Sequence, residues 1–253
     1  MSRRRMAKRL NVFVARATGL SRRAADKVIF DGRVSIDGEI VIEPGRQVDT
    51  NNLVAYNGNP LALPNEPIWL LLNKPKGYIT TRKDESGRRT VMDLLPEHLR
   101  GLFPVGRLDF DTEGVLLFTN DGETAHKMLH PGFEIERVYR AFLSTRIKPS
   151  DIDLARKGIL LDGRSALPVN IICSNYGESR SVCEITLAEG RYHEVKRFFK
   201  ALGYEVTSLE RLSHAGISAE GLNRSEWRLL KKSEIEALKS RLEHKIDQRQ
   251  NSK

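Results

Sequence analysis

Apolar residues near the start of the chain recur with the period of a helix. They occupy positions i, i+3, i+4 and i+7, as Leu10, Phe13, Val14 and Ala17. Gly19 follows as a helix end, and Ser21 is a favourable N-cap for a second helix. Short strands should flank Asp37 and Gly38, a dipeptide typical of tight hairpin turns because both positions need positive φ. The first sixty residues therefore predict two helices followed by a small sheet.

Beyond a proline-rich segment with Pro60, Pro64 and Pro67, strand-like and helix-like patterns alternate. We expect strands at 68–72, 115–119, 136–143, 166–173 and 181–187, and helices near 91–95, 124–130, 150–157, 192–203 and from 231 onward. Most consecutive strands in this pattern should form hairpins, so the predicted fold class is α+β. We expect a small N-terminal helix-helix-strand domain, followed by a larger domain with a mixed, mainly antiparallel sheet flanked by helices. The expected limits are a first domain at 8–60, a linker at 61–67, a second domain at 68–240 and a basic tail at 241–253.

Composition narrows the class of protein. Of the 253 residues, 40% are hydrophobic and 30% are charged, and no apolar run approaches the roughly 18 residues of a membrane span. The basic start lacks the apolar stretch of a secretory signal, so we expect a soluble, cytoplasmic protein without membrane contact. Cys173 and Cys183 have no CxxC spacing and are interpreted as small buried hydrophobes, and the six histidines form no metal motif. We expect no metal.

Positive charge is concentrated at the N-terminus. Residues 1–33 contain ten Lys or Arg and two Asp, a balance of +8 out of a net charge of +9 for the whole chain. Such a basic end is typical of a surface that binds phosphates, although a solvated tail without a partner would show the same balance.

The segment SRRAADKVIFDGRVSIDGEIV and the helix before it resemble the S-four type of RNA-binding domain over about residues 8–56. The resemblance implies that the basic residues of this part face RNA along the helix pair; these are Arg16, Arg22, Arg23, Lys27 and Arg33. Contacts of this kind position a protein on RNA rather than read its bases.

An acidic loop, GRLDFDTEG at residues 106–114, precedes the apolar strand of the second domain. Its carboxylates Asp109, Asp111 and Glu113 would repel one another unless their surroundings separate or neutralise them. A calcium loop is one interpretation, but Glu113 stands at its fifth position and Asn120 at its twelfth, where the ion needs a bidentate Glu. The other interpretations are a capped turn, in which Asp111 and Thr112 bond to their own backbone, and a catalytic carboxylate.

The run PVGRLDFDTEGVLLFTNDG resembles the signature of the pseudouridine synthases that act at single sites in ribosomal RNA. LLNKPKGYITTRKD, ERVYRAFL and LAEGRYHEVKRFFKALGYEV follow the same family in order, and the resemblance covers residues 8 to about 238. It implies that Asp109 is the catalytic aspartate, that Lys196 is its basic partner, and that Tyr139 stacks on the flipped uracil. It also implies that Arg107 fills the space that the uridine leaves in the RNA.

The chemistry that the resemblance implies explains the need for a carboxylate. Conversion of uridine to pseudouridine breaks the bond from the sugar to nitrogen and remakes it to carbon, and an ionised carboxylate can act as nucleophile or stabilise positive charge at the sugar. Neither route is favoured by the sequence. All bonds use the substrate's own atoms, so we expect no cofactor.

Further cations lie in the loop after the first strand of the second domain. Lys74 and Lys76 in NKPKG, with Arg82 and Lys83, are predicted to line the RNA path by phosphate contact, and an ordinary exposed loop is the alternative. Pro75 and Gly77 predict a sharp turn here.

The chain departs from the family pattern at Glu194, where Gln is common, at Phe199, where Met is common, and at SHAGIS after Arg211, where a more basic stretch is common. The stretches TRKDESGRRTVMDLLP and DTEGVLLFTNDG look closer to large-subunit than to small-subunit rRNA enzymes. The predicted partner is ribosomal RNA, free or in a pre-ribosomal particle, and the expected state is a monomer. The alternatives are a non-catalytic ribosome-assembly factor on the same fold, or a glycoside or nucleoside hydrolase, which would not explain the basic end.

Overall fold

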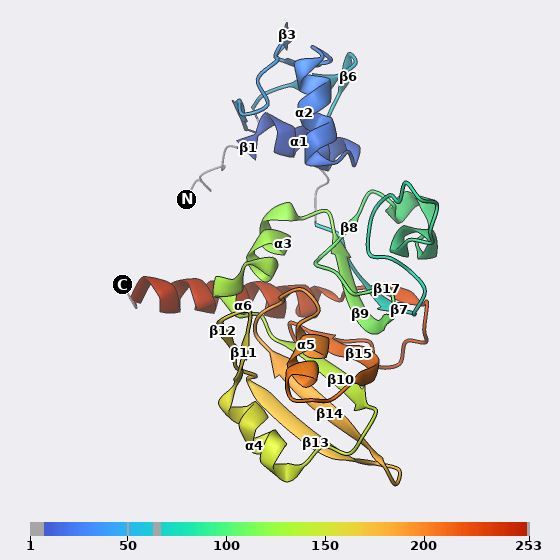
Figure 1. Cartoon of the computed structure of the whole chain (residues 1–253). Coiled ribbons are helices and arrows are strands. Elements are labelled where there is room, and N and C mark those ends of the chain that lie inside the picture. Colours follow the sequence, from blue (N-terminus) through green and yellow to red (C-terminus); the bar gives the residue numbers. More distant parts are fainter. Residues whose placement is uncertain (1–7, 50, 63–66, 252–253) are drawn as a thin grey trace. The chain divides into compact units, whose positions relative to one another are not determined.

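The structure, a computed structural model, describes residues 8–49, 51–62 and 67–251. The chain divides into two compact units between Ile68 and Trp69 (Figure 1).

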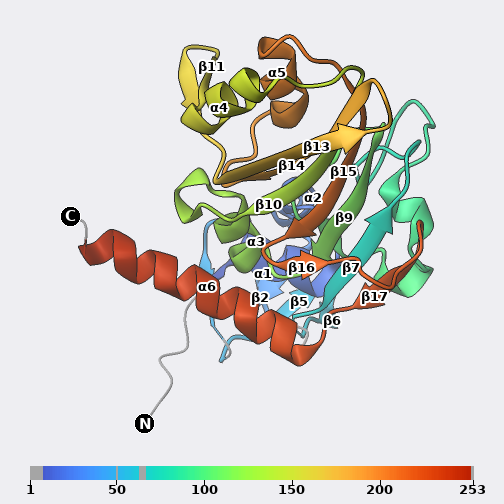
Figure 2. The same ribbon diagram turned by 90° about the horizontal axis from the view of Figure 1, so that it is seen from below.

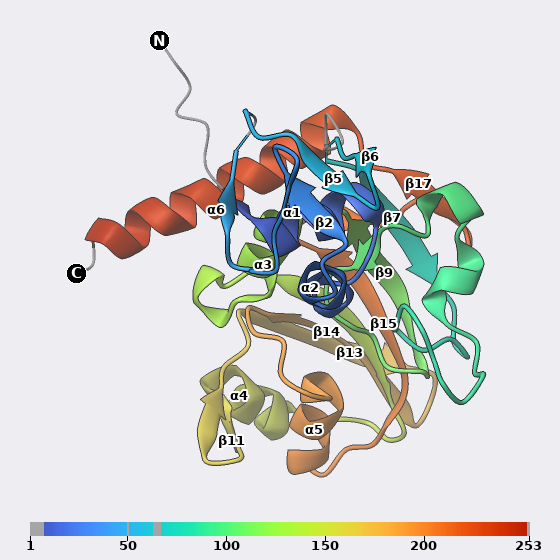
Figure 3. The ribbon, with the colours of Figure 1, turned by 90° about the horizontal axis from the view of Figure 1, so that it is seen from above.

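The first unit contains the two predicted helices and the predicted hairpin. Helix α1 spans Leu10–Thr18 and helix α2 spans Arg22–Phe30. The Ser21 hydroxyl accepts a hydrogen bond from the Ala24 amide, as an N-cap does, and apolar side chains of both helices share one core. Figure 3 shows α2 almost end-on beside α1. The short strands are β1 (Lys8–Arg9), β2 (Val34–Ile36), β3 (Glu39–Ile40), β4 (Gln47–Val48), β5 (Val54–Tyr56) and β6 (Asn59–Pro60).

Strands β3, β2, β5 and β6 form one sheet in that order, and β1 pairs with β4. Asp37 and Gly38 both have positive φ, as the turn between β2 and β3 requires. Lys8 and Arg9, directly before α1, form β1 and pair with β4.

The second unit is built on one mixed sheet, as predicted. Its strands follow the order β13-β14-β10-β15-β9-β7-β17, with β8 beside β9 and β16 beside β15. All neighbouring strands are antiparallel except β15 and β9. The strands are β7 (Trp69–Lys74), β8 (Phe103–Pro104), β9 (Thr112–Thr119), β10 (Arg137–Leu143), β13 (Asn170–Tyr176), β14 (Arg180–Leu187), β15 (Val206–His214), β16 (Ile217–Ser218) and β17 (Trp227–Leu229).

Helices cover the sheet on both faces. They are α3 (Gly122–Leu129), α4 (Pro149–Lys157), α5 (Glu194–Ala201) and α6 (Lys232–Asn251), with 3-10 turns η1 (Val91–Leu94), η2 (Glu97–Leu99) and η3 (Pro131–Phe133). Figure 2 shows α4 and α5 beside the β13–β14 end of the sheet, with a hairpin of β11 (Ile159–Leu161) and β12 (Arg164–Ala166) next to them. No helix in the described ranges is long and apolar enough to cross a membrane.

Strand alternation sorts the core into two layers. In β7, Trp69 and Leu71 pack with α3 and α6, whereas Leu70 and Leu72 pack with η1 and η2. Tyr139 of β10 contacts both the η1 core and the core under α4 and α5, so these two cores lie on the same face of the sheet. That face carries the site described below.

Several boundaries differ from the sequence prediction. The strand expected at 166–173 is divided, because residues 164–166 pair with β11 and only residues from 170 onward join the large sheet. The helix expected at 192–203 begins at Glu194, because His193 has a positive φ of 49°. The helix expected from 231 continues to Asn251, through most of the segment 241–253 that is expected to be a tail. Strands β15 and β17 were not predicted.

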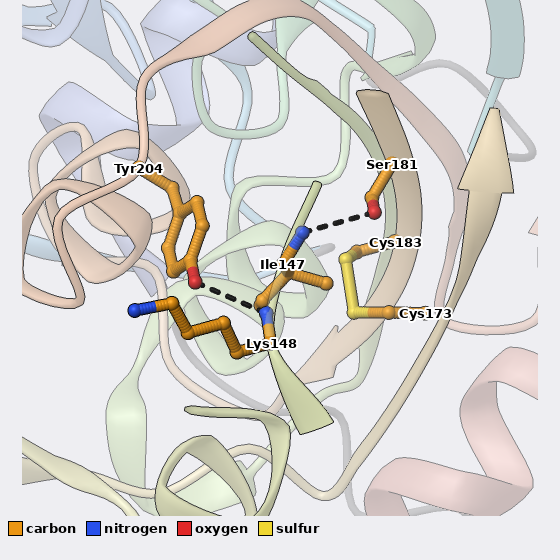
Figure 4. Close-up of a disulfide and its surroundings, with 6 residues drawn as sticks. All are labelled: Ile147, Lys148, Cys173, Ser181, Cys183 and Tyr204. Carbon is orange, nitrogen blue, oxygen red and sulfur yellow. Dashed lines mark hydrogen bonds between the residues drawn. A yellow bond between two sulfur atoms is a disulfide. The ribbon is translucent and has the colours of Figure 1, made fainter. Parts of the chain in front are cut away.

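The interpretation of the two cysteines as separate buried hydrophobes was wrong. Cys173 and Cys183 face each other across β13 and β14 with their Cα atoms 4.1 Å apart, and they form a disulfide (Figure 4). The neighbouring segment is fixed by two further contacts visible in Figure 4: the Ile147 amide donates to the Ser181 hydroxyl at 3.1 Å, and the Lys148 amide to the Tyr204 hydroxyl at 3.1 Å.

Candidate active site

Asp109 faces a pocket on the η1 and α5 side of the sheet. The acidic loop brings its carboxylate to the start of β9, where the side chain remains 30% exposed. One wall comes from the sheet and the loop, and the other from the segment that leads into α5. The lining residues are Arg107, Leu108, Asp109, Thr112, Tyr139, Leu187, Gly190, Arg191, His193, Glu194, Val195 and Leu209.

Two nitrogen groups lie beside the Asp109 carboxylate. Lys196 Nζ is 3.6 Å from Asp109 Oδ2 and 2.6 Å from Asp111 Oδ1, so one ammonium serves both carboxylates. His193 Nε2 is 3.1 Å from Asp109 Oδ1. Partial burial would raise the pKa of Asp111, but the hydrogen bond and charge of Lys196 outweigh it and lower that pKa below its ordinary value. Helix α5 thus keeps a cation between the two acidic side chains.

Tyr139 and Arg107 reach the same pocket from different directions. Tyr139 lies half-buried in the floor, in β10, opposite Ile185 and Arg211 of the neighbouring strands. Arg107 is exposed at the rim. The structure therefore brings together Asp109, Tyr139, Lys196 and Arg107, which lie in three separate parts of the sequence.

Lys74 is not an RNA-facing cation, contrary to the sequence prediction. Its side chain is fully buried, and its ammonium donates to the carbonyl oxygens of Pro75 at 3.1 Å, Asp109 at 3.0 Å and Thr112 at 2.8 Å. Burial lowers the pKa of Lys74 to about 8. Lys74 thus ties residues 109 and 112 of the acidic loop to the end of β7.

The segment after Lys74 holds the same loop at further points. The Gly77 amide donates to the Phe110 carbonyl at 2.9 Å, and Thr80 exchanges hydrogen bonds with both backbone groups of Leu108. Residues 74–80 thus act as a support for residues 108–112, which explains the NKPKGYIT run as a structural element. Lys76 stays half-exposed, and its ammonium donates to the Ser208 hydroxyl at 3.0 Å.

A cluster of buried basic side chains lies beneath the pocket, and sequence reasoning missed it. Arg137, Arg211 and His214 face one another from β10 and β15, each less than 7% exposed. Arg137 donates to the Ile135 and Met128 carbonyls, and Arg211 Nε donates to the Val115 carbonyl at 2.7 Å. Burial is the main cause that lowers the pKa of Arg137, and it holds the pKa of His214 well below 6.5.

Gly114 allows β9 to pass against β15 at this cluster. Its φ is +102°, and a Cβ atom there would stand 2.2 Å from the Arg211 carbonyl oxygen. Only glycine fits the position.

His193 is the residue in direct contact with Asp109 that the sequence did not single out. The sequence predicts it as part of the helix from residue 192, but it precedes α5 in a left-handed conformation, and this turns its ring toward the carboxylate. Histidine is among the non-glycine residues that adopt this conformation more often, which is a weak signal in a sequence. Glu194, one position later, lines the pocket wall, and burial raises its pKa.

The basic residues of the first unit differ in exposure. Arg22, Arg23 and Lys27 are exposed on α2, whereas Arg16 is only half-exposed. Arg33 donates to the Asn57 side chain at 2.9 Å and lies over the ring of Tyr56. In the part of the chain that the structure describes, no group of three His, Cys, Asp or Glu side chains is placed to hold a metal ion.

Comparison with known proteins places this geometry in a family. The family model for RNA pseudouridylate synthases matches residues 68–201, the part that contains the pocket, and the model for the S4 domain matches residues 8–54. The chain belongs to the RNA pseudouridine synthase family. It is therefore a pseudouridine synthase, an isomerase, with an N-terminal S4 domain, as the sequence analysis predicted.

Relatives of this synthase match along almost the whole chain. An uncharacterized RNA pseudouridine synthase of Aquifex aeolicus is 37% identical over 92% of this chain and 94% of its own. The ribosomal large subunit pseudouridine synthase B of Bacillus subtilis is 34% identical over 93% and 97%, and the ribosomal small subunit pseudouridine synthase A of Escherichia coli is 35% identical over 90% and 98%. A crystal structure of a pseudouridylate synthase aligns with a TM-score of 0.64 at 33% identity, over 91% of this chain and 99% of the other.

Proposed function

We propose that this synthase converts one specific uridine of ribosomal RNA to pseudouridine and that Asp109 is its catalytic carboxylate. The observation that carries the proposal is the position of Asp109 in a pocket, with Lys196 Nζ at 3.6 Å and His193 Nε2 at 3.1 Å from its two oxygens. The names of the B. subtilis and E. coli relatives, each specific to one ribosomal subunit, support rRNA as the substrate class.

The carboxylate matches the charge that the reaction develops. The bond from the sugar C1′ to uracil N1 breaks, a bond from C1′ to C5 forms, the C5 proton leaves and N1 gains a proton. The Asp109 carboxylate supplies negative charge beside the electron-poor sugar carbon, and the Lys196 ammonium lies 3.6 Å from it.

Tyr139 and Arg107 fit the other two tasks of the site. Tyr139 offers an aromatic face in the pocket floor on which the uracil can stack, and Arg107 at the rim can enter the gap that the flipped nucleotide leaves. Extrusion of a base costs a few kcal/mol of stacking, and an inserted guanidinium restores part of it.

We further propose that the S4 unit captures the RNA through exposed cations of α2, namely Arg22, Arg23 and Lys27. Large-subunit rRNA is the first substrate to test, because the stretches at 81–96 and 111–122 look closer to large-subunit enzymes.

Pseudouridine mapping of both rRNAs tests the proposal. A strain that lacks the gene should lose one pseudouridine, or a few neighbouring ones, and a copy of the wild-type gene should restore them. The Asp109→Asn gene should not. If the deletion strain keeps every rRNA pseudouridine but assembles ribosomes poorly, the protein acts as a non-catalytic assembly factor, and the proposed function is wrong.

A further inference from the structure

Tyr192 projects from the rim of the Asp109 pocket and belongs to no apolar core of the described residues. The residue is 74% exposed, the highest exposure among the large apolar and aromatic residues that the structure describes. Its ring stacks on the ring of His193, with the centroids 3.8 Å apart and the planes inclined by 18°. One face of the tyrosine is therefore covered by an imidazole, and the other face is open to solvent.

Hydrogen bonds and ion pairs hold the backbone around Tyr192 on both sides. Arg197 donates to the Tyr192 carbonyl at 3.3 Å. Arg191 donates to the Ser165 carbonyl at 2.8 Å and pairs with Glu189 at 2.7 Å, and its amide donates to the Glu194 carboxylate at 3.0 Å. The segment that carries the exposed ring is therefore already ordered, so RNA binding loses little conformational entropy by fixing it.

The stacked pair connects the open ring to the reacting centre. His193 Nε2 lies 3.1 Å from Asp109 Oδ1, so only one imidazole ring separates the catalytic carboxylate from Tyr192. A uridine held at Asp109 leaves its two neighbouring nucleotides at the rim of the pocket. Their bases have lost a stacking partner when the uridine flips out.

We propose that the open face of Tyr192 stacks on the base of an RNA nucleotide next to the target uridine, an inference that rests on the proposed function. Single-stranded RNA is bound in this way by exposed aromatic rings, because every base has a π-face. Arg107, exposed beside the pocket, adds positive charge for the phosphates that connect the nucleotides. The contact tightens binding of the RNA strand but does not select a base.

Steady-state kinetics of single-residue variants test the proposal. The substrates are unmodified transcripts of large-subunit and small-subunit rRNA, and the variants are Tyr192→Ala, Tyr192→Phe and Tyr176→Ala. Tyr176 is a matched control, because it is an exposed tyrosine on β13, 51% exposed, outside the pocket lining. Melting temperatures of all variants should equal that of the wild type, since an exposed ring contributes little to folding.

Tyr192→Ala should raise KM about 5- to 150-fold, the change that corresponds to about 1–3 kcal/mol per stacked base, with kcat changed less than about threefold. Tyr192→Phe and Tyr176→Ala should match the wild type, because stacking needs the ring and not the hydroxyl. A fluorescent 2-aminopurine placed on either side of the target uridine should be quenched by the wild type and by Tyr192→Phe, and not by Tyr192→Ala.

The possible failures are distinct. Absence of turnover by the wild type on both transcripts overturns the proposed function and this inference with it. Turnover by the wild type with an unchanged KM for Tyr192→Ala overturns the inference alone. A fall in kcat at unchanged KM also overturns it, because Tyr192 would then only position His193.

Discussion

Replacement of Lys74 by methionine tests whether the lysine ammonium stabilises the acidic loop or contacts an RNA phosphate. Methionine keeps the length of the apolar stem and removes the ammonium. Three carbonyl oxygens, those of Pro75, Asp109 and Thr112, then lose their buried donor. Because these carbonyls belong to the Asp109 loop and its support, we expect the Lys74→Met protein to be less stable and to bind RNA with unchanged affinity.

The size of the effect follows from two opposing contributions. The Asp109 carbonyl still accepts a hydrogen bond from the Thr112 amide, so only the carbonyls of Pro75 and Thr112 are left unsatisfied. Each unsatisfied acceptor costs about 2 kcal/mol, or about 4 kcal/mol for both. The lowered pKa of Lys74, about 8 instead of 10.5, means that burial disfavours its charge by about 3 kcal/mol, and the variant no longer bears this cost. A net destabilisation of about 1 kcal/mol remains, which for a unit of this size lowers Tm by about 2–4 °C.

Thermal unfolding followed by circular dichroism measures the stability, and fluorescence anisotropy with a labelled rRNA fragment measures the affinity. Lys76→Met is the matched control. Its ammonium is half-exposed, so this change should lower Tm less than Lys74→Met does. A Lys74→Met protein with the wild-type Tm and a tenfold weaker RNA complex would refute the reasoning, because the ammonium would then contact phosphate.

Three further outcomes are expected. Buried His214 stays neutral when the folded protein is acidified, whereas the same histidine in the unfolded chain takes up a proton below about pH 6.5. Between pH 6.5 and 5, the free energy of unfolding should therefore fall more steeply in the wild type than in His214→Leu, by about 1.4 kcal/mol per pH unit, and urea titrations at each pH measure the difference. Lys196→Met should lower kcat about 10²–10³-fold with little change in RNA affinity, and an unchanged kcat would remove Lys196 from the site. The triple variant Arg22→Ala, Arg23→Ala and Lys27→Ala should weaken RNA binding and reduce the slope of log K against log salt by about 2–3, measured between 50 and 200 mM salt; an unchanged slope would argue against α2 as the RNA surface.

The sequence predicted the α+β architecture because the signals for helices, strands and turns are local. Helical periods, caps and the Asp37-Gly38 turn are read within a few residues, and the structure has the expected elements there. The approach of Asp109 to Lys196 was expected only from the family resemblance, because 87 residues and several strands separate them along the chain.

Lys74 shows what local patterns do not reveal. Lysine is almost never fully buried, so an NKPKG loop suggests an exposed cation. Its burial depends on carbonyl groups of residues 109 and 112, which only the folded sheet places around it. The left-handed turn at His193 is similar, because the apolar period of the following helix continues back through it in the sequence.

The disulfide depends on the register of the hairpin, which the strands expected at 166–173 and 181–187 did not fix. A turn centred near Glu178 pairs each residue of one strand with a fixed partner on the other, and Cys173 and Cys183 are equally distant from that centre. The number of cysteines gave no indication of the disulfide, since two cysteines alone predict no disulfide framework.

The role of Asp109 is tested by turnover of purified Asp109→Asn protein on the rRNA transcript that the wild type modifies, measured as tritium release from [5-³H]uridine. We expect no detectable release, with RNA affinity equal to that of the wild type. Asp111→Asn is the control and should retain turnover within about tenfold, because Asp111 is mostly exposed. Release by Asp109→Asn at a rate comparable to the wild type would contradict the central claim that this carboxylate performs the chemistry.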